Sequence, residues 1–327
     1  MSEIILQQTR VDQGLPYYYK FIEGFPCVTD LANATEDQVL RLWQGLGYYS
    51  RARNLHKTAK LIVSEHSAQF PRSEEGLLKL PGIGPYTAAA IASIAFDEPV
   101  PVVDGNVYRL LSRYYGIHLD ILSAKAFKHF YQLGLRLIDK QNPGDYNQAV
   151  MEFGAIQCKT GKPDCNNCLL NIGCIAAQNN WQLILPVKKK RAKSRNRFFN
   201  YLILTIDSKI LMRQRTGNDI WQGLYDFVLI ETEKPHLFNS LDHEVIDRIK
   251  NEIVHIDTND NIIRHILTHQ ILNVNFALIE LAPNAECIDW LVKEGYSWYG
   301  PDEIEELPKP VLISNYLDNY LNLINLQ

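Results

Sequence analysis

Four cysteines fall within seventeen positions of this chain, in the pattern Cys158-x6-Cys165-x2-Cys168-x5-Cys174. Thiolates this close in sequence can bind one metal centre, and both zinc and a cubane iron–sulfur cluster take four of them. Zinc sites usually combine two close pairs with a longer spacer, whereas here only Cys165 and Cys168 form a close pair. The other cysteines, Cys27 and Cys287, stand alone and are interpreted as ordinary thiols. The pattern therefore predicts a structural metal site at residues 158–174.

The chain has 327 residues, enough for two domains at roughly 150 residues each. With 46% hydrophobic and 21% charged residues, we expect a soluble globular protein, and no apolar run approaches the ~20 residues of a membrane span. Residues 1–8 lack the basic start and the small-residue cleavage site of a secretory signal, so we expect a cytoplasmic protein. Because the net charge is −4, any nucleic-acid contact must come from a local patch.

A basic segment separates two regions of different texture. Seven of the eleven residues from Val187 to Arg197 are Lys or Arg, which is typical of an interdomain linker or of a solvated tether. Before it the pattern is helical, since Thr35-x-x-Gln38 predicts a capping box and residues 87–96 predict a buried helix. Strand-like runs follow it at residues 199–206, 209–212 and 274–279. They predict a second domain that mixes α and β structure.

Residues 80–88, Leu-Pro-Gly-Ile-Gly-Pro-Tyr-Thr-Ala, join two helical patterns through a tight turn. Gly82 and Gly84 allow a backbone close to a phosphate, whose oxygens accept hydrogen bonds from amides at the start of the next helix. A plain connection between two helices explains the same residues. Downstream, Asp104 precedes Gly105 and Asn106, and an aspartate before a helix is usually an N-cap.

Together, the hairpin and the cysteine loop resemble the helix-hairpin-helix DNA glycosylases of the endonuclease III and MutY superfamily. The resemblance implies an all-α helix-hairpin-helix glycosylase domain with a [4Fe–4S] loop, followed by an α+β Nudix-like domain. It places these domains at residues 1–185 and 199–327, with a basic linker at residues 186–198. The [4Fe–4S] cluster would be held by Cys158, Cys165, Cys168 and Cys174.

The same resemblance assigns catalytic roles. In this superfamily the aspartate at the place of Asp104 faces the anomeric carbon of the extruded nucleotide, where a fixed carboxylate stabilises an oxocarbenium-like transition state. Asn106 would order the site beside it. The string from Ser2 to Thr9 resembles the segment around the catalytic glutamate of the MutY family, which makes Glu3 the acid that protonates the departing purine.

Tyr86 stands where bifunctional relatives carry a lysine, whose amine forms a Schiff base with the sugar. A phenol cannot form an imine, so we predict a monofunctional glycosylase in which water completes the reaction. Aromatic packing in the hairpin is the alternative role for Tyr86.

The resemblance to the MutY adenine glycosylases covers nearly the whole chain and implies removal of adenine mispaired with 8-oxoguanine or guanine in double-stranded DNA. It assigns contacts with the lesion, the flipped adenine or the DNA backbone to Gln8, Thr9, Leu46, Gly47, Tyr48, Gly82, Gly84, Gln148, Thr268 and His269. Core packing is the alternative for Tyr48, and a plain exposed position on a helix is the alternative for Gln148.

Residues 265–269, His-Ile-Leu-Thr-His, correspond to a Phe-Ser-His loop of the family, with Leu267 and Thr268 in place of Phe and Ser. Packing of His265 and His269 is the alternative. The second domain lacks the acidic helix with which Nudix hydrolases bind their metal, so we predict that it reads the lesion without hydrolysing nucleotides.

Two other functions stay open. One is a glycosylase of the same superfamily that acts on another base. The other is a truncated, catalytically impaired protein that binds mismatched DNA, because family members begin well before the position of Met1 and Glu3 then lies at a chain end. In each case we expect a monomer at the nucleoid without membrane contact.

Overall fold

The computed structural model describes residues 1–189, 194–236, 238–283 and 288–324. Cys287 and residues 190–193 of the basic segment lie outside these ranges. Contacts divide the chain into two compact units. Unit 1 comprises Met1–Gly14, Phe25–Ala32 and Asn54–Arg191, and unit 2 comprises Leu15–Gly24, Asn33–Arg53 and Ala192–Gln327. Among the described residues, no helix is both long and apolar enough to cross a membrane.

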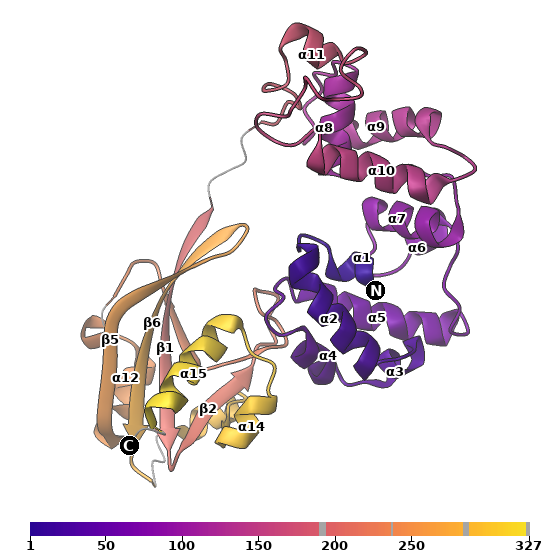
Figure 1. The fold of residues 1–327 in the computed structure, drawn as a ribbon. Helices are drawn as coiled ribbons and strands as arrows, with labels where there is room; N and C mark the ends of the chain where they lie inside the picture. Colours follow the sequence, from indigo (N-terminus) through magenta and orange to yellow (C-terminus); the bar gives the residue numbers. More distant parts are fainter. Residues whose placement is uncertain (190–193, 237, 284–287, 325–327) are drawn as a thin grey trace. The chain divides into compact units, whose positions relative to one another are not determined.

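Helices form the regular structure of residues 1–189, as the sequence pattern predicts (Figure 1). They are α1 (Ser2–Ile5), α2 (Val11–Gly24), α3 (Val28–Asn33), α4 (Glu36–Trp43), α5 (Ser50–Glu65), α6 (Glu74–Leu77), α7 (Pro85–Phe96), α8 (Gly105–Tyr114), α9 (Ala124–Leu137), α10 (Pro143–Ile156) and α11 (Ile175–Asn179). The predicted capping box of α4 is confirmed. Thr35 Oγ1 accepts from the backbone N–H of Gln38 at 3.2 Å, and the Gln38 side chain accepts from the Thr35 N–H at 2.9 Å.

Helix α7 is the buried helix that the small-residue run predicts, and α10 lies along α7 and α8 (Figure 1). Asn147 of α10 is buried and donates to Ser93 Oγ and to the Val100 carbonyl, each at 2.9 Å. Its Oδ1 accepts from the backbone N–H of Val102 at 3.0 Å. These bonds satisfy a buried amide and fix the segment that leads to Asp104.

Unit 2 contains a mixed seven-stranded sheet. Its strands are β1 (Arg195–Ile206), β2 (Lys209–Gln214), β3 (Tyr225–Asp226), β4 (Val228–Thr232), β5 (Ile253–Ile266), β6 (Gln270–Leu281) and β7 (Ser297–Tyr299). Strand β1 runs parallel to β6, with Arg195 opposite Gln270, and the other strand pairs are antiparallel. The strands predicted at residues 209–212 and 274–279 are confirmed within β2 and β6.

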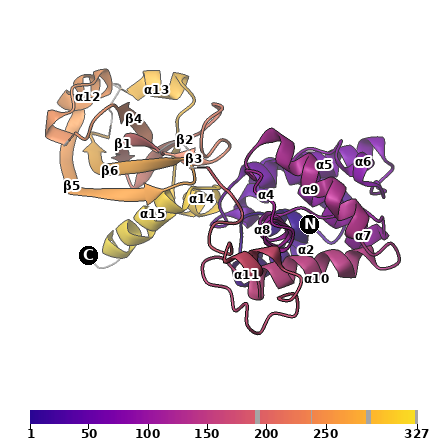
Figure 2. The same ribbon diagram turned by 90° about the horizontal axis from the view of Figure 1, so that it is seen from above.

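Two hydrophobic clusters cover the two faces of this sheet, and β1 contributes to both. Leu202 and Leu204 pack in the cluster that includes α12 (Glu244–Ile249) and α13 (Asp289–Lys293). Tyr201 and Ile203 pack in the cluster that includes α14 (Pro301–Glu306) and α15 (Val311–Ile324). Figure 2 shows these helix pairs on opposite sides of the strands. A strand buried on both faces accounts for the continuous apolar run at residues 199–206. Two short 3₁₀ helices, η1 (Phe238–Ser240) and η2 (Lys250–Glu252), complete the unit.

Strand β1 begins at Arg195, four residues before the apolar run that marks it in the sequence. Arg195 and Arg197 of the basic segment are therefore strand residues paired with β6. Arg197 is buried, and two carboxylates bind its guanidinium. Because a charged residue is rarely buried unless it is paired, the sequence pattern does not indicate that this part of the strand is buried.

Candidate active site

The turn between α6 and α7 has the conformation that its two glycines suggest. Gly82 adopts a φ of +76°, and a Cβ there would lie 2.6 Å from the Cβ of Asn54, so this position requires glycine. Gly84 caps α7 with a φ of −86°, and no heavy atom lies within 4 Å of a Cβ placed on it. The N-terminal end of α7, with its partial positive charge, therefore lies beside an uncrowded backbone, an arrangement that suits phosphate binding.

The first turn of α7 brings Tyr86 next to Glu3 of α1. The phenol O–H donates to Sδ of Met151 at 3.8 Å. The Tyr86 side chain also interacts with the Glu3 carboxyl. Burial raises the pKa of Glu3 above its ordinary value of 4.5. Burial also raises the pKa of Tyr86 to about 12, and the negative charges of Glu3 and Asp104 contribute. Three predicted catalytic residues thus share one site, in which Glu3 keeps its proton to higher pH than free glutamate does.

Asp104 is the N-cap of α8, and its two carboxylate oxygens have different partners. Oδ1 accepts from the backbone N–H of Val107 at 2.7 Å, and Oδ2 accepts from the side-chain amide of Asn106 at 2.9 Å. The capping role expected of an aspartate before a helix is therefore present. The same two bonds hold the carboxylate in one orientation, as a group that stabilises developing positive charge requires.

Arg109, one turn further along α8, orients Asn106. Its Nη2 donates to Asn106 Oδ1 at 2.8 Å and also to the carbonyl oxygen of Gly154. Its Nε donates to the carbonyl oxygen of Cys158 at 2.7 Å. A Cβ on Gly154 would lie 2.8 Å from the carbonyl oxygen of Asn106, so α10 can approach α8 this closely only at a glycine. Arg109 therefore connects the Asp104 carboxylate, through Asn106, to the first residue of the cysteine loop.

The cysteines of the loop line one small cavity, namely Cys158, Cys165, Cys168 and Cys174. All four are free thiols. Arg113 Nη1 donates to Sγ of Cys158 at 3.4 Å, and burial together with the neighbouring thiols raises the pKa of Cys165. Within the described ranges, no three His, Cys, Asp or Glu side chains converge to hold a single metal ion. The four thiols thus share one cavity, and Cys165 interacts with the other three.

Other predicted contact residues of unit 1 lie on its surface. Gln148 is exposed on α10, and Gln8 is exposed after α1 with a left-handed φ of 57°. Thr9 Oγ1 lies 3.3 Å from the carbonyl oxygen of Gln7, to which it donates. The roles of Gln8, Thr9 and Gln148 stay predictions.

Within unit 2, the residues predicted to contact the lesion line a common cavity of about 390 Å³, a volume typical of ligand sites. They are Leu46, Gly47, Tyr48, Thr268 and His269. The hydroxyl groups of Tyr48 and Thr268 are hydrogen-bonded to each other. Tyr48 is 45% exposed and adopts a left-handed φ of 50°, so it is not a core residue. His265 does pack, because its ring lies 5.9 Å from that of Trp221, and burial lowers its pKa.

The sequence patterns did not reveal several residues that shape these sites. Gln7 Nε2 donates to Thr87 Oγ1 at 2.9 Å, which ties α1 to α7 next to Glu3 and Tyr86. Arg109 and Arg113 are buried four residues apart on α8. That spacing of two arginines on one helix face is the one sequence signal that could have indicated a buried cationic role. Asn147 gives no such signal.

The two parts of the chain match two known domain families. Residues 1–133 match the HhH-GPD superfamily base excision DNA repair proteins, and residues 200–319 match the NUDIX domain. A thermostable thymine-DNA glycosylase of known structure is 27% identical, with a TM-score of 0.51 over 54% of this chain and 82% of that chain. Fold and site thus define a helix-hairpin-helix DNA glycosylase with a C-terminal Nudix-like domain, which confirms the predicted fold class. The cluster in the cysteine loop stays a prediction.

Similarity to curated proteins identifies the family within this class of DNA glycosylases. The adenine DNA glycosylase of Buchnera aphidicola subsp. Acyrthosiphon pisum is 32% identical over 325 residues, which cover 98% of this chain and 89% of the relative. The adenine DNA glycosylase of Rattus norvegicus is 46% identical over 179 residues, which cover 54% of this chain and 35% of the relative. The chain belongs to the adenine DNA glycosylase, or MutY, family of hydrolases.

Proposed function

We propose that the chain hydrolyses the N-glycosidic bond of adenine opposite 8-oxoguanine or guanine in double-stranded DNA, without cutting the strand. The observation that carries this proposal is the shared site of Glu3, Tyr86 and Asp104. Burial raises the pKa of Glu3 there, and the charges of both carboxylates contribute to the raised pKa of Tyr86. Membership of the adenine DNA glycosylase family supports the choice of base. The DNA substrate places the protein at the nucleoid.

Glu3 is the general acid in this proposal. A purine leaves more readily once one of its ring nitrogens is protonated, and a carboxylic acid serves best when its pKa lies near the working pH. Burial moves the pKa of Glu3 in that direction. Gln7, which bonds to Thr87 at 2.9 Å, keeps α1 against α7 and so keeps Glu3 in place.

Asp104 stabilises the sugar as the bond breaks. Glycosidic cleavage develops positive charge at the anomeric carbon, and a preorganised carboxylate stabilises that charge without having to reorient. The bonds from Val107 and Asn106, at 2.7 and 2.9 Å, supply that preorganisation.

Tyr86 makes the reaction monofunctional. A phenol is protonated at neutral pH, and the raised pKa of Tyr86, about 12, keeps it so beside the two carboxylates. It offers no amine for a Schiff base, so water completes the hydrolysis and the strand stays intact.

We also propose that Cys158, Cys165, Cys168 and Cys174 hold a [4Fe–4S] cluster. A cubane takes one thiolate at each iron, and four free thiols line one cavity here. Zinc sites usually combine two close pairs, whereas only Cys165 and Cys168 form a close pair in this loop. When bound, the cluster cross-links residues 158–174. Arg113, through its bond to the Cys158 sulfur, and Arg109, through the Cys158 carbonyl, connect that loop to α8.

Recognition is divided between the two predicted domains, residues 1–185 and 199–327. The basic segment predicted as a linker at residues 186–198 joins them, although its residues from Arg195 onward belong to strand β1. Hairpin residues Gly82 and Gly84 bind a backbone phosphate, and Gln148 contacts the flipped adenine. Contacts at the lesion come from Gln8, Thr9, Leu46, Tyr48, Thr268 and His269. The assignments of Tyr48, Thr268 and His269 are supported by the cavity that they line. Two hydroxyl groups and a histidine lie there beside a space of about 390 Å³.

A single-turnover assay tests the proposal. Duplexes with adenine opposite 8-oxoguanine, guanine or thymine are incubated with the full chain and analysed with and without alkali. We expect breaks in the first two duplexes, after alkali only. Breaks without alkali would contradict the monofunctional mechanism, and duplex binding without base release would support an impaired binding protein. Iron and acid-labile sulfide in the purified protein test the cluster, and zinc in their place would exclude it.

A further inference from the structure

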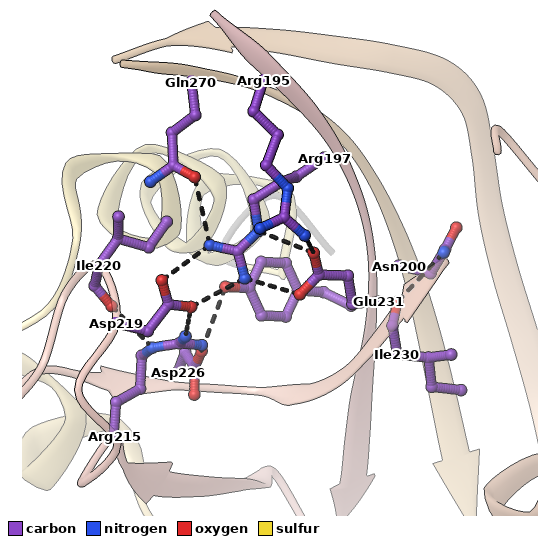
Figure 3. Close-up of polar contacts among 11 residues, drawn as sticks. Arg195, Arg197, Asn200, Arg215, Asp219, Ile220, Asp226, Ile230, Glu231 and Gln270 are labelled. Carbon is purple, nitrogen blue, oxygen red and sulfur yellow. Dashed lines mark hydrogen bonds and ion pairs between the residues drawn. The ribbon is translucent and has the colours of Figure 1, made fainter. Parts of the chain in front are cut away.

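Arg197 of β1 is 8% exposed and binds three side chains at once (Figure 3). Its Nη1 and Nη2 donate to the two carboxylate oxygens of Asp219, each at 2.8 Å. Its Nε and Nη2 donate to the carboxylate of Glu231 at 2.7 and 2.6 Å. Nη1 also lies 3.4 Å from Oε1 of Gln270, to which it donates. One planar guanidinium thus fixes two carboxylates and one amide, which a flexible lysine ammonium cannot do.

Two of these partners, Asp219 and Gln270, line the same cavity as Thr268. Asp219 lines the cavity in the loop at residues 216–223, next to Trp221. Gln270 lines it at the end of the β5–β6 turn, two residues after Thr268. These segments are far apart in sequence, and Arg197 lies between them in Figure 3. Arg197 therefore holds together two parts of the cavity wall.

The loop at residues 216–223 needs such a support. Trp221 adopts a φ of +60°, in the left-handed region that a bulky side chain rarely occupies. Such a conformation persists only where neighbouring contacts determine it, and it is common at ligand sites. The Trp221 ring lies 6.4 Å from that of Phe199, and the Arg197 guanidinium lies 4.7 Å from the centre of the same Phe199 ring. Arg197 also binds Asp219, two residues before Trp221, in a bidentate manner, and the Trp221 ring lies 5.9 Å from that of His265.

Two arginines, Arg197 and Arg215, bind the carboxylate of Asp219. Arg215 donates to Asp219 at 3.1 Å and to the buried Asp226 at 2.7 Å. Burial favours a higher pKa for Asp219, but hydrogen bonds from Arg197 and charge from both arginines hold the pKa below its usual value. A buried ion-pair network adds little stability over apolar residues of the same volume, whereas it specifies one geometry. The network is therefore better suited to positioning than to general stabilisation.

We propose that Arg197 is a positioning residue for recognition of the base opposite adenine. It holds the loop at residues 216–223 and the turn at residues 266–270 so that Trp221 and Thr268 line the same cavity. The inference rests on the proposed function, because it assumes that this cavity receives the 8-oxoguanine. It adds a residue with no contact of its own to the cavity, as Arg197 is not in the wall.

Three variants and one control test the role. Arg197→Met removes every donor, and Arg197→Lys keeps the charge without the bidentate geometry. Gln270→Leu removes the link to the turn and leaves both carboxylates bound to Arg197. Arg248→Met is the matched control. Arg248 also pairs with a carboxylate, that of Glu244, and lies 4.8 Å from the centre of the Trp290 ring, but its helix α12 does not line the cavity.

Single-turnover rate constants on adenine opposite 8-oxoguanine and opposite guanine give the first readout. For Arg197→Met we expect the rate opposite 8-oxoguanine to fall between about ten- and a hundredfold, the range that a small misplacement causes. The rate opposite guanine should change little, Arg197→Lys should be intermediate, and Arg248→Met should match the unmodified protein. An unchanged ratio of the two rate constants, whether both fall equally or neither falls, would overturn the role.

Hydrogen exchange of the free protein gives a second readout that does not depend on the substrate. We expect faster exchange at residues 216–223 and 266–270 in Arg197→Met, and at residues 266–270 alone in Gln270→Leu. Unchanged exchange in both segments contradicts the positioning role even if the protein is active. If the unmodified chain shows no preference for 8-oxoguanine, the proposed lesion specificity fails, and exchange alone then decides whether Arg197 positions the wall. Should Arg197→Met not fold, Gln270→Leu and Arg197→Lys carry both tests.

Discussion

The side-chain amide of Asn106 donates to Oδ2 of Asp104 at 2.9 Å. An Asn amide can in principle be turned either way, but here its oxygen accepts from Arg109 at 2.8 Å. Because arginine can only donate, it fixes the oxygen of Asn106 on its own side and the NH₂ group on the side of Asp104. The orientation of the Asp104 carboxylate thus depends on a cation that does not touch it.

Replacement of Asp104 by asparagine separates chemistry from folding. Asparagine is as good an N-cap as aspartate, so the free energy of unfolding should change by less than about 1 kcal/mol. Loss of the negative charge should lower the single-turnover rate at least about a thousandfold, since that charge acts in the transition state. Gel-shift titration should show nearly unchanged duplex binding. A parallel loss of binding and base release would show that Asp104 does not act in the chemical step.

Replacement of Arg109 by lysine should affect both the rate and the stability. Arg109 is 8% exposed and donates to Asn106, Gly154 and Cys158, and a single ammonium cannot reach all three in this geometry. We expect the free energy of unfolding to fall by about 1.5–3 kcal/mol, the contribution of hydrogen bonds to a charged group. Denaturant unfolding measures this change. Arg136→Lys, at an exposed position on α9, is the control and should be neutral.

Local motifs could be predicted from the sequence because each is encoded by neighbours. The Thr35 capping box, the glycine turn and the capping position of Asp104 all depend on residues within a few positions of one another. The expected role of Glu3 came from the resemblance to a family. In the structure Glu3 of α1 lies next to Tyr86, which belongs to α7 and is distant in the chain.

Long-range polar partners could not be predicted in the same way. Arg109 meets the Cys158 carbonyl 49 residues later, and Arg197 meets Asp219, Glu231 and Gln270 at separations of 22, 34 and 73 residues. Hydrophobic periodicity indicates which face of an element is buried but not which charged groups neutralise each other inside. Arg197 therefore looked like part of a solvated linker, although it is a buried strand residue.

The pH dependence of base release should report on Glu3. Because burial raises the pKa of Glu3 above 4.5 and the acid acts in its protonated form, the rate should fall as pH rises through the raised pKa. The same shift affects folding. Stability from protonated Glu3 is fully present below the unfolded pKa and is lost as pH rises through the folded one. Glu3→Gln should lose the descending limb of the pH–rate profile, and an unchanged limb would assign it to another group.

Removal of the Tyr86 hydroxyl should move that limb. Interaction with the Tyr86 hydroxyl favours the ionised form of Glu3 and so lowers the pKa of Glu3, against the larger effect of burial. In Tyr86→Phe the pKa of Glu3 should rise further, so the descending limb of the profile should shift to higher pH. The site should still give no covalent product with borohydride, because neither side chain has an amine. An unchanged limb, or a shift to lower pH, would show that the hydroxyl does not stabilise ionised Glu3.

The two hairpin glycines provide a matched pair of substitutions. Gly82→Ala places a side chain at a φ of +76° and a Cβ 2.6 Å from Asn54, so the free energy of unfolding should fall by about 1–3 kcal/mol. Gly84→Ala has no neighbour within 4 Å and an ordinary φ of −86°, so stability should change little. Its methyl group would instead occupy the space beside the start of α7. If a phosphate binds there, Gly84→Ala should weaken duplex binding while the thermal midpoint stays the same, and unchanged binding would place the phosphate contact elsewhere.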